Sequence, residues 1–232
     1  MPVHLQREIE RLKKKILSLG AFVEDNVRKA VKSIEERDSK LASQIIESDL
    51  EIDHAEVEVE EECLKILALH QPVAIDLRFV IAVIKINSDL ERIGDLAVNI
   101  AEQAFFLAAH EKVDIPFDFA GMSEKAQRML TMSLDALVRM DSALARTVCA
   151  LDDEVDAMHR DMYGQVQDGI RRRPEQLESL THLISVSRCL ERIADHATNI
   201  AEDVIYMLEG EIVRHKAEDW KPRASHQEDT AS

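Results

Sequence analysis

A thirteen-residue segment occurs twice in this chain of 232 residues, at positions 100 residues apart. Residues 90–102 read LERIGDLAVNIAE and residues 190–202 read LERIADHATNIAE, so ten of the thirteen positions are identical. The Asp-Ser pair at 38–39 also recurs at 141–142, with an offset of 103. A repeat whose offset changes by a few residues indicates a duplication with small loop deletions. The chain is therefore expected to fold as two copies of one unit.

Each copy has the pattern of three amphipathic helices. Apolar residues recur at spacings of three and four, as one buried helix face requires, and no strand pattern competes. The expected helices cover residues 3–36, 39–69, 72–109, 123–139, 142–171 and 174–209, with Pro72 and Pro174 each suited to a first helical turn. We predict an all-α protein, a tandem repeat of two three-helix bundles with six long helices. The expected division is 1–110 for the first bundle, 111–122 for a linker, 123–212 for the second bundle and 213–232 for a disordered tail containing Trp220.

Charge and composition exclude several classes of protein. A net charge of −16 argues against binding a nucleic-acid backbone and is compatible with cations or basic protein surfaces as partners. The three widely spaced cysteines are expected to be buried hydrophobes in a reducing compartment. The charged first twenty residues do not resemble a secretory signal, and the apolar run 79–84 is too short for membrane insertion. We expect a soluble, cytoplasmic protein.

The duplicated segment carries an oxygen-rich stripe as well as an apolar side. On a helix, Asp95, Asn99 and Glu102 lie at roughly 40°, 80° and 20° from Glu91, away from the apolar side. Glu91 and Asp95 are like charges four residues apart, which costs a helix about 0.2–0.5 kcal/mol. The stripe could be a solvated face, with Arg92 pairing to Asp95, but the second copy keeps the same unfavourable pair. Neutralisation by a cation explains this better.

The middle helix of each half carries further acidic residues. Asp49 and Asp53 share one face, and Asp152 and Asp156 occupy the same places in the second half. If middle and last helices pack side by side, their acidic faces converge along one groove. Oxygen ligands of this kind suit iron, Mg, Mn or Ca better than zinc. The alternative is an acidic solvent-facing helix, which the run EVEVEEE at 56–62 also fits.

The predicted metal ligands thus form two equivalent sets of carboxylate and amide side chains. They are Asp49, Asp53, Glu91, Asp95, Asn99 and Glu102 in the first half, and Asp152, Asp156, Glu191, Asp195, Asn199 and Glu202 in the second. His159, which takes the place of Glu56, is expected to be a surface residue.

The motifs do not indicate an enzyme, because no nucleophile with a base or glycine-rich phosphate loop is evident. Two other functions stay open. A ferritin-like di-metal protein needs inward carboxylates and two ExxH motifs, of which this chain has one, from Glu51 to His54. A metal-independent helical adaptor would use the acidic faces to bind basic partners.

The duplicated ERIGD…NIAE and ERIADHATNIAE motifs, with QPVAIDLRFV at 71–80, resemble the PhoU family over roughly residues 3–210. The resemblance implies an all-α, cytoplasmic, non-enzymatic protein, commonly a homodimer. It also implies metal-binding E(D)xxxD motifs, which fall on Glu91/Asp95, Glu191/Asp195, Asp49/Asp53 and Asp152/Asp156.

The resemblance further implies a role in phosphate uptake. Members of the family restrain the phosphate-starvation response by contacting the ATPase subunit of a phosphate ABC transporter and a membrane sensor histidine kinase. The two halves of this chain differ, since Leu96 is replaced by His196, so their sites need not bind the same metal.

Overall fold

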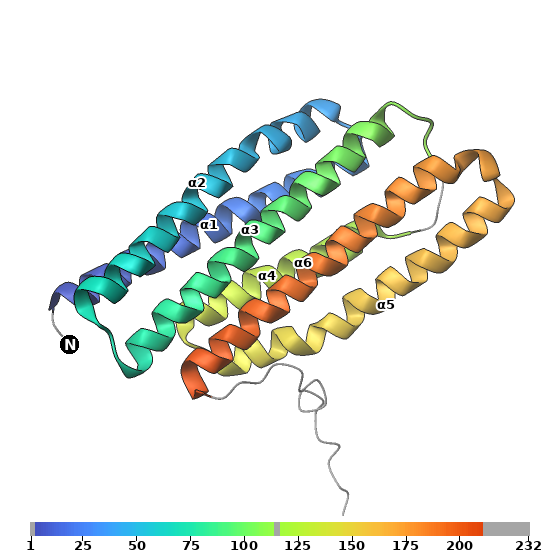
Figure 1. The fold of residues 1–232 in the computed structure, drawn as a ribbon. Helices are drawn as coiled ribbons and strands as arrows, with labels where there is room; N and C mark the ends of the chain where they lie inside the picture. Colours follow the sequence, from blue (N-terminus) through green and yellow to red (C-terminus); the bar gives the residue numbers. More distant parts are fainter. Residues whose placement is uncertain (1–2, 114–116, 211–232) are drawn as a thin grey trace, which may run out of the picture.

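The computed structural model describes residues 3–113 and 117–210 (Figure 1). Its elements are α1 (Val3–Glu36), α2 (Ser39–His70), α3 (Ala74–Ala108), α4 (Phe119–Arg139), α5 (Ser142–Arg172), the short 3-10 helix η1 (Pro174–Gln176) and α6 (Leu177–Glu209). The predicted all-α fold with six long helices is confirmed, and the described residues contain no strand. The expected tail 213–232, with Trp220, lies outside the described residues.

The duplicated Asp-Ser pairs act as helix N-caps. A carboxylate oxygen of Asp38 accepts hydrogen bonds from the Lys40 and Leu41 amides at 2.9 and 3.1 Å, and Asp141 accepts one from the Leu144 amide at 3.0 Å. These bonds satisfy amides that have no partner inside the helix. The caps therefore start α2 and α5 at equivalent places.

Two helix starts differ from the sequence prediction. Helix α4 begins at Phe119 rather than residue 123, because the Asp118 carboxylate caps it by accepting from the Gly121 amide at 2.8 Å. The connection before it is correspondingly shorter than expected. Pro72 lies before α3, which begins at Ala74, whereas Pro174 does open η1.

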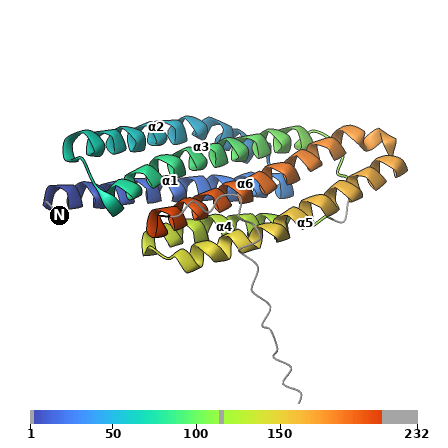
Figure 2. The same ribbon diagram turned by 60° about the horizontal axis from the view of Figure 1, so that its bottom comes forward.

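The six long helices run along a common axis, and the two repeats lie side by side (Figures 1 and 2). Helices α3 and α6, one from each repeat, pack against each other, and α1 packs against α4. Among the described residues α2 contacts only α1 and α3, and α5 contacts only α4, α6 and η1. Helices α2 and α5 are therefore the outer edges of the molecule.

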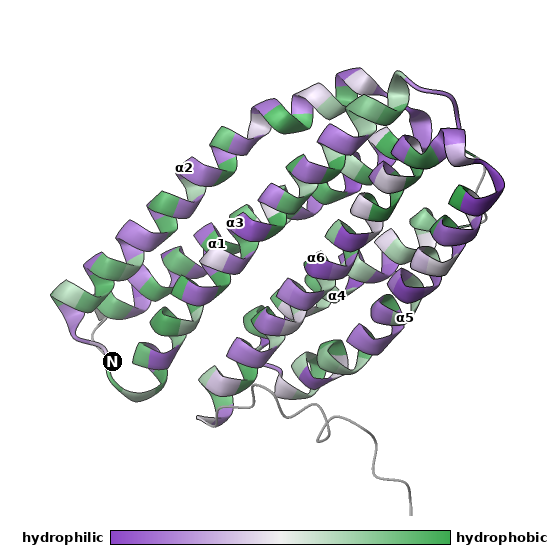
Figure 3. Cartoon of the chain, turned by 45° about the vertical axis from the view of Figure 1, so that its right-hand side comes forward, coloured by the Kyte–Doolittle hydropathy of each residue, from purple (hydrophilic) through white to green (hydrophobic). Residues whose placement is uncertain are grey.

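The two repeats share one hydrophobic core. A single cluster of buried residues takes side chains from all six long helices. Hydrophobic and hydrophilic residues alternate along each helix, as amphipathic packing requires (Figure 3). The apolar side of the duplicated segment lies in this core, so the prediction that these residues pack inside the protein is confirmed. Its buried members include Ile93, Leu96, Ala97, Ile100, Ile193, Ala197 and Ile200.

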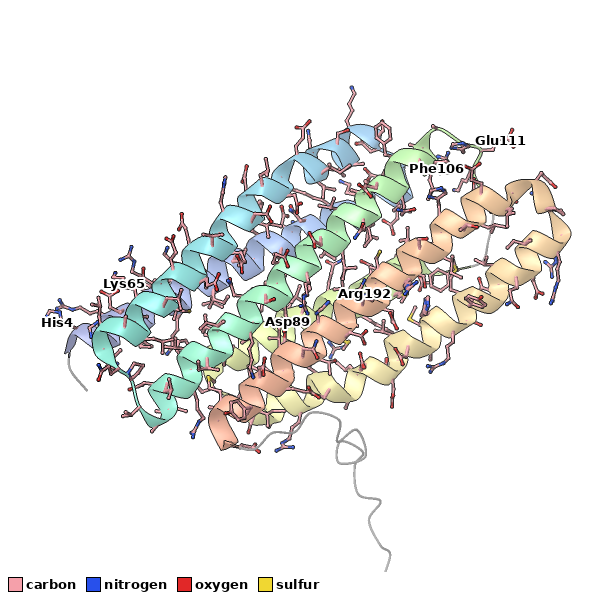
Figure 4. The ribbon with its side chains drawn as sticks, viewed as in Figure 1. His4, Lys65, Asp89, Phe106, Glu111 and Arg192 are labelled. Atoms are coloured by element: carbon pink, nitrogen blue, oxygen red, sulfur yellow. The ribbon has the colours of Figure 1, made fainter. Side chains whose placement is uncertain are left out.

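Polar contacts also join the repeats where α3 meets α6. Lys85 Nζ lies 3.0 Å from Asp203 Oδ1, and His196 Nδ1 lies 2.8 Å from Asp89 Oδ1 with both side chains buried. Asp89 sits near the middle of the long axis in Figure 4. The α3–α6 contact is thus fixed by specific pairs as well as by apolar packing.

The cysteines are free, and burial raises the pKa of each thiol above its usual value. The pKa is raised to about 12 for Cys63 and Cys149 and to about 11 for Cys189. Thiols of this kind stay protonated and unreactive at neutral pH. No helix in the described part of the chain has the length and apolar character needed to cross a bilayer.

Candidate metal centre

In each repeat the middle and last helices lie side by side, as the sequence analysis required. The pairs are α2 with α3 and α5 with α6, each joined by a short connection that reverses the chain (Figure 1). Side chains four residues apart on one helix then face equivalent side chains on its neighbour. The acidic residues of both helices converge on the groove between them.

The tightest convergence is in the second repeat. One carboxylate oxygen from each of Asp152, Asp156 and Asp195 lies within 4.8 Å of the other two. Metal–oxygen bonds of about 2.0–2.6 Å bring ligand oxygens to such spacings around a common ion. We define these three residues as the aspartate trio. They bring together one complete predicted pair, Asp152/Asp156, and Asp195 from the pair Glu191/Asp195.

Burial and mutual repulsion make ionisation of the trio's carboxyl groups unfavourable. The pKa of Asp152 is raised to about 6, first by burial and then by the charges of Asp195 and Asp156. The pKa of Asp195 is also raised to about 6, by burial and then by Glu191 and Asp156. Burial, followed by Asp156, raises the pKa of Glu191. A bound cation would relieve both the repulsion and the loss of solvation.

One oxygen of the trio has no well-directed hydrogen-bond partner. Asp152 Oδ1 is shielded from solvent and accepts no hydrogen bond of good geometry. A hydrogen bond with the neighbouring Thr198 hydroxyl lowers the pKa of Asp152, but its geometry is poor, since neither Thr198 Oγ1 nor Asp152 Oδ1 has a well-directed partner. Buried polar atoms are rarely left in this condition. The Oδ1 atom is therefore suited to accept a ligand bond.

The first repeat brings its acidic residues together more loosely. Burial raises the pKa of Asp49, and the charges of Asp53 on the same helix and of Asp95 across the groove raise it further. The pKa of Asp95 is raised by burial and Asp53, and that of Glu91 by burial, Asp95 and Asp53. In the part of the chain that the structure describes, only the aspartate trio meets the 4.8 Å spacing.

The remaining predicted ligands lie further along the grooves. Glu102 is seven residues from Asp95, about 10 Å along the helix axis, and is exposed together with Asn99. Glu202 and Asn199 are half-buried on α6, and the charge of Glu202 contributes to the raised pKa of Cys149 on α5. These four residues are not members of the aspartate trio.

Two residues near the trio behave differently from the sequence prediction. His159 is half-buried rather than a surface residue, and its Nδ1 lies 2.7 Å from Ser187 Oγ. The sequence analysis also did not predict that Thr198 lies beside Asp152. The signal was available, because Thr198 replaces Val98 within the duplicated segment and so adds a hydroxyl beside the acidic stripe.

Comparisons with known proteins agree with the duplication and the fold. The family model described as the PhoU domain matches residues 16–104 and 119–204. A phosphate-specific transport system accessory protein PhoU homolog from Pseudomonas aeruginosa is 37% identical over 211 residues, covering 90% of this chain and 86% of the relative. The homolog from Aquifex aeolicus is 37% identical over 212 residues, covering 91% and 96%.

Solved structures show the same architecture. The crystal structure of PhoU from Pseudomonas aeruginosa superposes with a TM-score of 0.83 at 36% identity, covering 89% of this chain and 99% of that one. The phosphate transport system regulatory protein PhoU from Streptococcus pneumoniae superposes with a TM-score of 0.82 at 28% identity, covering 90% and 99%.

Proposed function

The chain belongs to the PhoU family, and from this premise we propose that it is a metal-binding regulator of phosphate uptake in the cytoplasm. The role of accessory or regulatory protein of phosphate transport is supported by the family model and by the names of the relatives. In the finer proposal, the protein restrains the phosphate-starvation response when phosphate is plentiful. It acts without catalysis.

The proposed partners are the ATPase subunit of a phosphate ABC transporter and a membrane sensor histidine kinase, with the protein acting as a homodimer. The fold supports a scaffold of this kind, because six long helices present extended outer faces while their inner faces share one core. Deletion of the gene should raise expression of a phosphate-starvation reporter in phosphate-rich medium. Unchanged reporter expression would contradict the regulatory role.

The aspartate trio carries the metal-binding part of the proposal. Three carboxylates within 4.8 Å, two with a pKa of about 6, form a site that gains from a hard cation. Iron, Mg or Mn fit these oxygen ligands, whereas a structural zinc site usually takes thiolate and imidazole ligands. Asp152, Asp156 and Asp195 would hold the ion. Its binding at low pH releases protons, because the ligands must be ionised.

Metal binding is tested on protein purified without an affinity tag. Elemental analysis identifies the bound ion, and calorimetric titration of the demetallated protein measures its affinity. Asp152→Asn and Asp195→Asn should each weaken binding tenfold or more, because they remove a charge without changing side-chain shape. Asp161→Asn is the matched control, since Asp161 is an exposed acid on the same helix. Equal affinities for all four proteins would exclude the trio as the site.

The geometry favours this function over the ferritin-like alternative. A di-metal oxidase encloses its carboxylates within a four-helix core. Here the trio lies in the groove between α5 and α6, where the side chain of Asp195 is partly open to solvent. The metal-independent adaptor differs in its prediction, because demetallated protein would then bind both partners as tightly as the metal-loaded protein.

A further inference from the structure

Helix α2 has an apolar row on its outer face. Leu50, Val57 and Leu64 are 66%, 50% and 55% exposed, and they follow one another at intervals of seven residues. Seven residues make almost two turns, so the three side chains lie in one line that spans about 20 Å. Leu69 and Val73 are also exposed, but Leu69 lies about 140° around the helix from Leu64 and so does not continue this line. We call Leu50, Val57 and Leu64 the outer seam.

The outer seam takes no part in packing the described fold. Ile45, Ile52, Val59 and Ile66 form a separate row on α2 that is buried in the common core. In the described residues α2 contacts only α1 and α3. Figure 3 shows hydrophobic residues recurring along α2. Figure 4 places Lys65, the neighbour of Leu64, near the C-terminal end of α2, where the chain continues into α3. Helix α2 is thus apolar on two faces, of which the fold uses one.

The second repeat shows that the fold does not need an apolar outer face. At the offset of 103 residues, the outer seam corresponds to Asp153, Arg160 and Gln167 on α5. All three are exposed and polar, although α5 packs against its neighbours as α2 does. The outer seam is therefore a property of the first repeat alone. Exposed apolar rows on a soluble surface commonly mark interaction sites.

The charges beside the outer seam indicate the partner's chemistry. Nine of the sixteen residues from 47 to 62 are acidic, and none is Lys or Arg. Helical positions place Glu47 and Glu61 on one side of Leu50, with Lys65 on that same side beside Leu64, and Asp53 and Glu60 on the other, all within roughly 80°. One apolar residue per heptad with charged neighbours is half of the two-position repeat of a helix–helix seam, in which flanking charges select the partner. A second copy of this acidic face would repel it.

We propose that the outer seam binds an amphipathic helix of a partner protein whose apolar residues repeat every seven positions and whose flanking residues are Lys or Arg. The partner's apolar row packs along Leu50, Val57 and Leu64. Its basic residues pair with the carboxylates on both sides. This inference does not rest on metal binding, because changes to the outer seam leave every carboxylate of the aspartate trio in place.

A synthetic peptide tests the surface directly. The probe is a labelled 21-residue helix with Leu at one position of each heptad and Lys at the flanking positions, titrated with full-length protein in fluorescence anisotropy. Leu50→Gln/Val57→Gln/Leu64→Gln should weaken its binding tenfold or more. Tyr163→Gln, which removes an exposed apolar side chain from α5, should leave binding unchanged. Leu50→Gln alone, measured beside the triple variant, should give a smaller loss in the same direction.

The probe sequence provides the second control. Replacing its Lys by Glu, or its Leu by Gln, should each weaken binding to the native protein tenfold or more. The proposal is overturned by equal binding of native protein and folded triple variant, or by equal binding of the Lys and Glu peptides. It is also overturned if ultracentrifugation shows native dimers that the triple variant cannot form, because a second copy would then occupy the outer seam. Circular dichroism establishes that each variant is folded.

Discussion

Gly94→Ala should destabilise the protein, and Ile52→Val should rescue it. A Cβ atom on Gly94 of α3 would lie 2.9 Å from Ile52 Cδ1 and 3.2 Å from Ile52 Cγ2 on α2. The equivalent positions of the second repeat hold Ala194 and Val155. The first repeat thus has the extra methyl group on its middle helix, whereas the second repeat has it on its last helix. The double variant recreates in the first repeat the combination that the second repeat already uses.

The magnitude follows from two opposing effects. Alanine improves helix propensity over glycine by about 1 kcal/mol, while an extra methyl in a packed core costs about 1–3 kcal/mol. Rotation about χ2 can move Cδ1 of Ile52, but its Cγ2 stays in place because β-branched residues have one strongly preferred χ1 in a helix. We expect Gly94→Ala to cost about 1 kcal/mol net. Ile52→Val alone should cost about 0.5–1.5 kcal/mol.

In the double variant the new methyl fills the space that Cδ1 of Ile52 vacated. Its free energy of unfolding should lie within about 0.5 kcal/mol of the native value, so the coupling between the two changes is about 1–3 kcal/mol. Urea unfolding of the native protein, both single variants and the double variant measures this coupling. Gly164→Ala is the control, because a Cβ there meets nothing within 4 Å and should stabilise by up to about 1 kcal/mol. Additive effects, or a Gly94→Ala variant as stable as Gly164→Ala, would refute the packing argument.

Three other changes have expected outcomes. The pKa of Asp152 is raised from 3.8 to about 6, so the folded metal-free protein binds this proton more tightly than the unfolded chain does. The native protein therefore loses stability as the pH rises through that interval. After allowance for partial exposure, the free energy of unfolding of Asp152→Asn should rise by about 1 kcal/mol relative to that of the native protein between pH 4 and pH 7, measured by urea unfolding with a chelator. Asp89→Ala should cost about 1–3 kcal/mol because the buried His196 loses its acceptor, and adding His196→Leu should restore part of the loss in thermal unfolding. Asp38→Ala should cost about 1 kcal/mol by removing the cap of α2, whereas Asp38→Asn should cost much less in the same assay.

The candidate metal centre was predictable in its residue types but not in its geometry. Helical spacing alone places Glu191 and Asp195 on one face, because the angle between them depends only on the helix. The meeting of Asp195 with Asp152 depends on how closely α5 and α6 approach, which spacing along one helix does not specify. Burial of Asp152 and the nearby Thr198 hydroxyl follow from the same approach. The approach of the two helices therefore sets the difference between the closely spaced carboxylates of the second repeat and the more loosely spaced ones of the first.

The same division applies to the whole fold. The amino-acid sequence alone determined the duplication, the six helices and the separation of apolar from acidic faces, because each depends on periodicity and contacts within a few residues. Only the tertiary structure decided that the two repeats share one core, that α2 and α5 lie at the edges, and that the outer seam on α2 stays uncovered in the described fold. These features arise from contacts between residues far apart in the chain. Similar amphipathic helices can make such contacts in several ways, and side-chain volumes at positions such as Gly94 select among them.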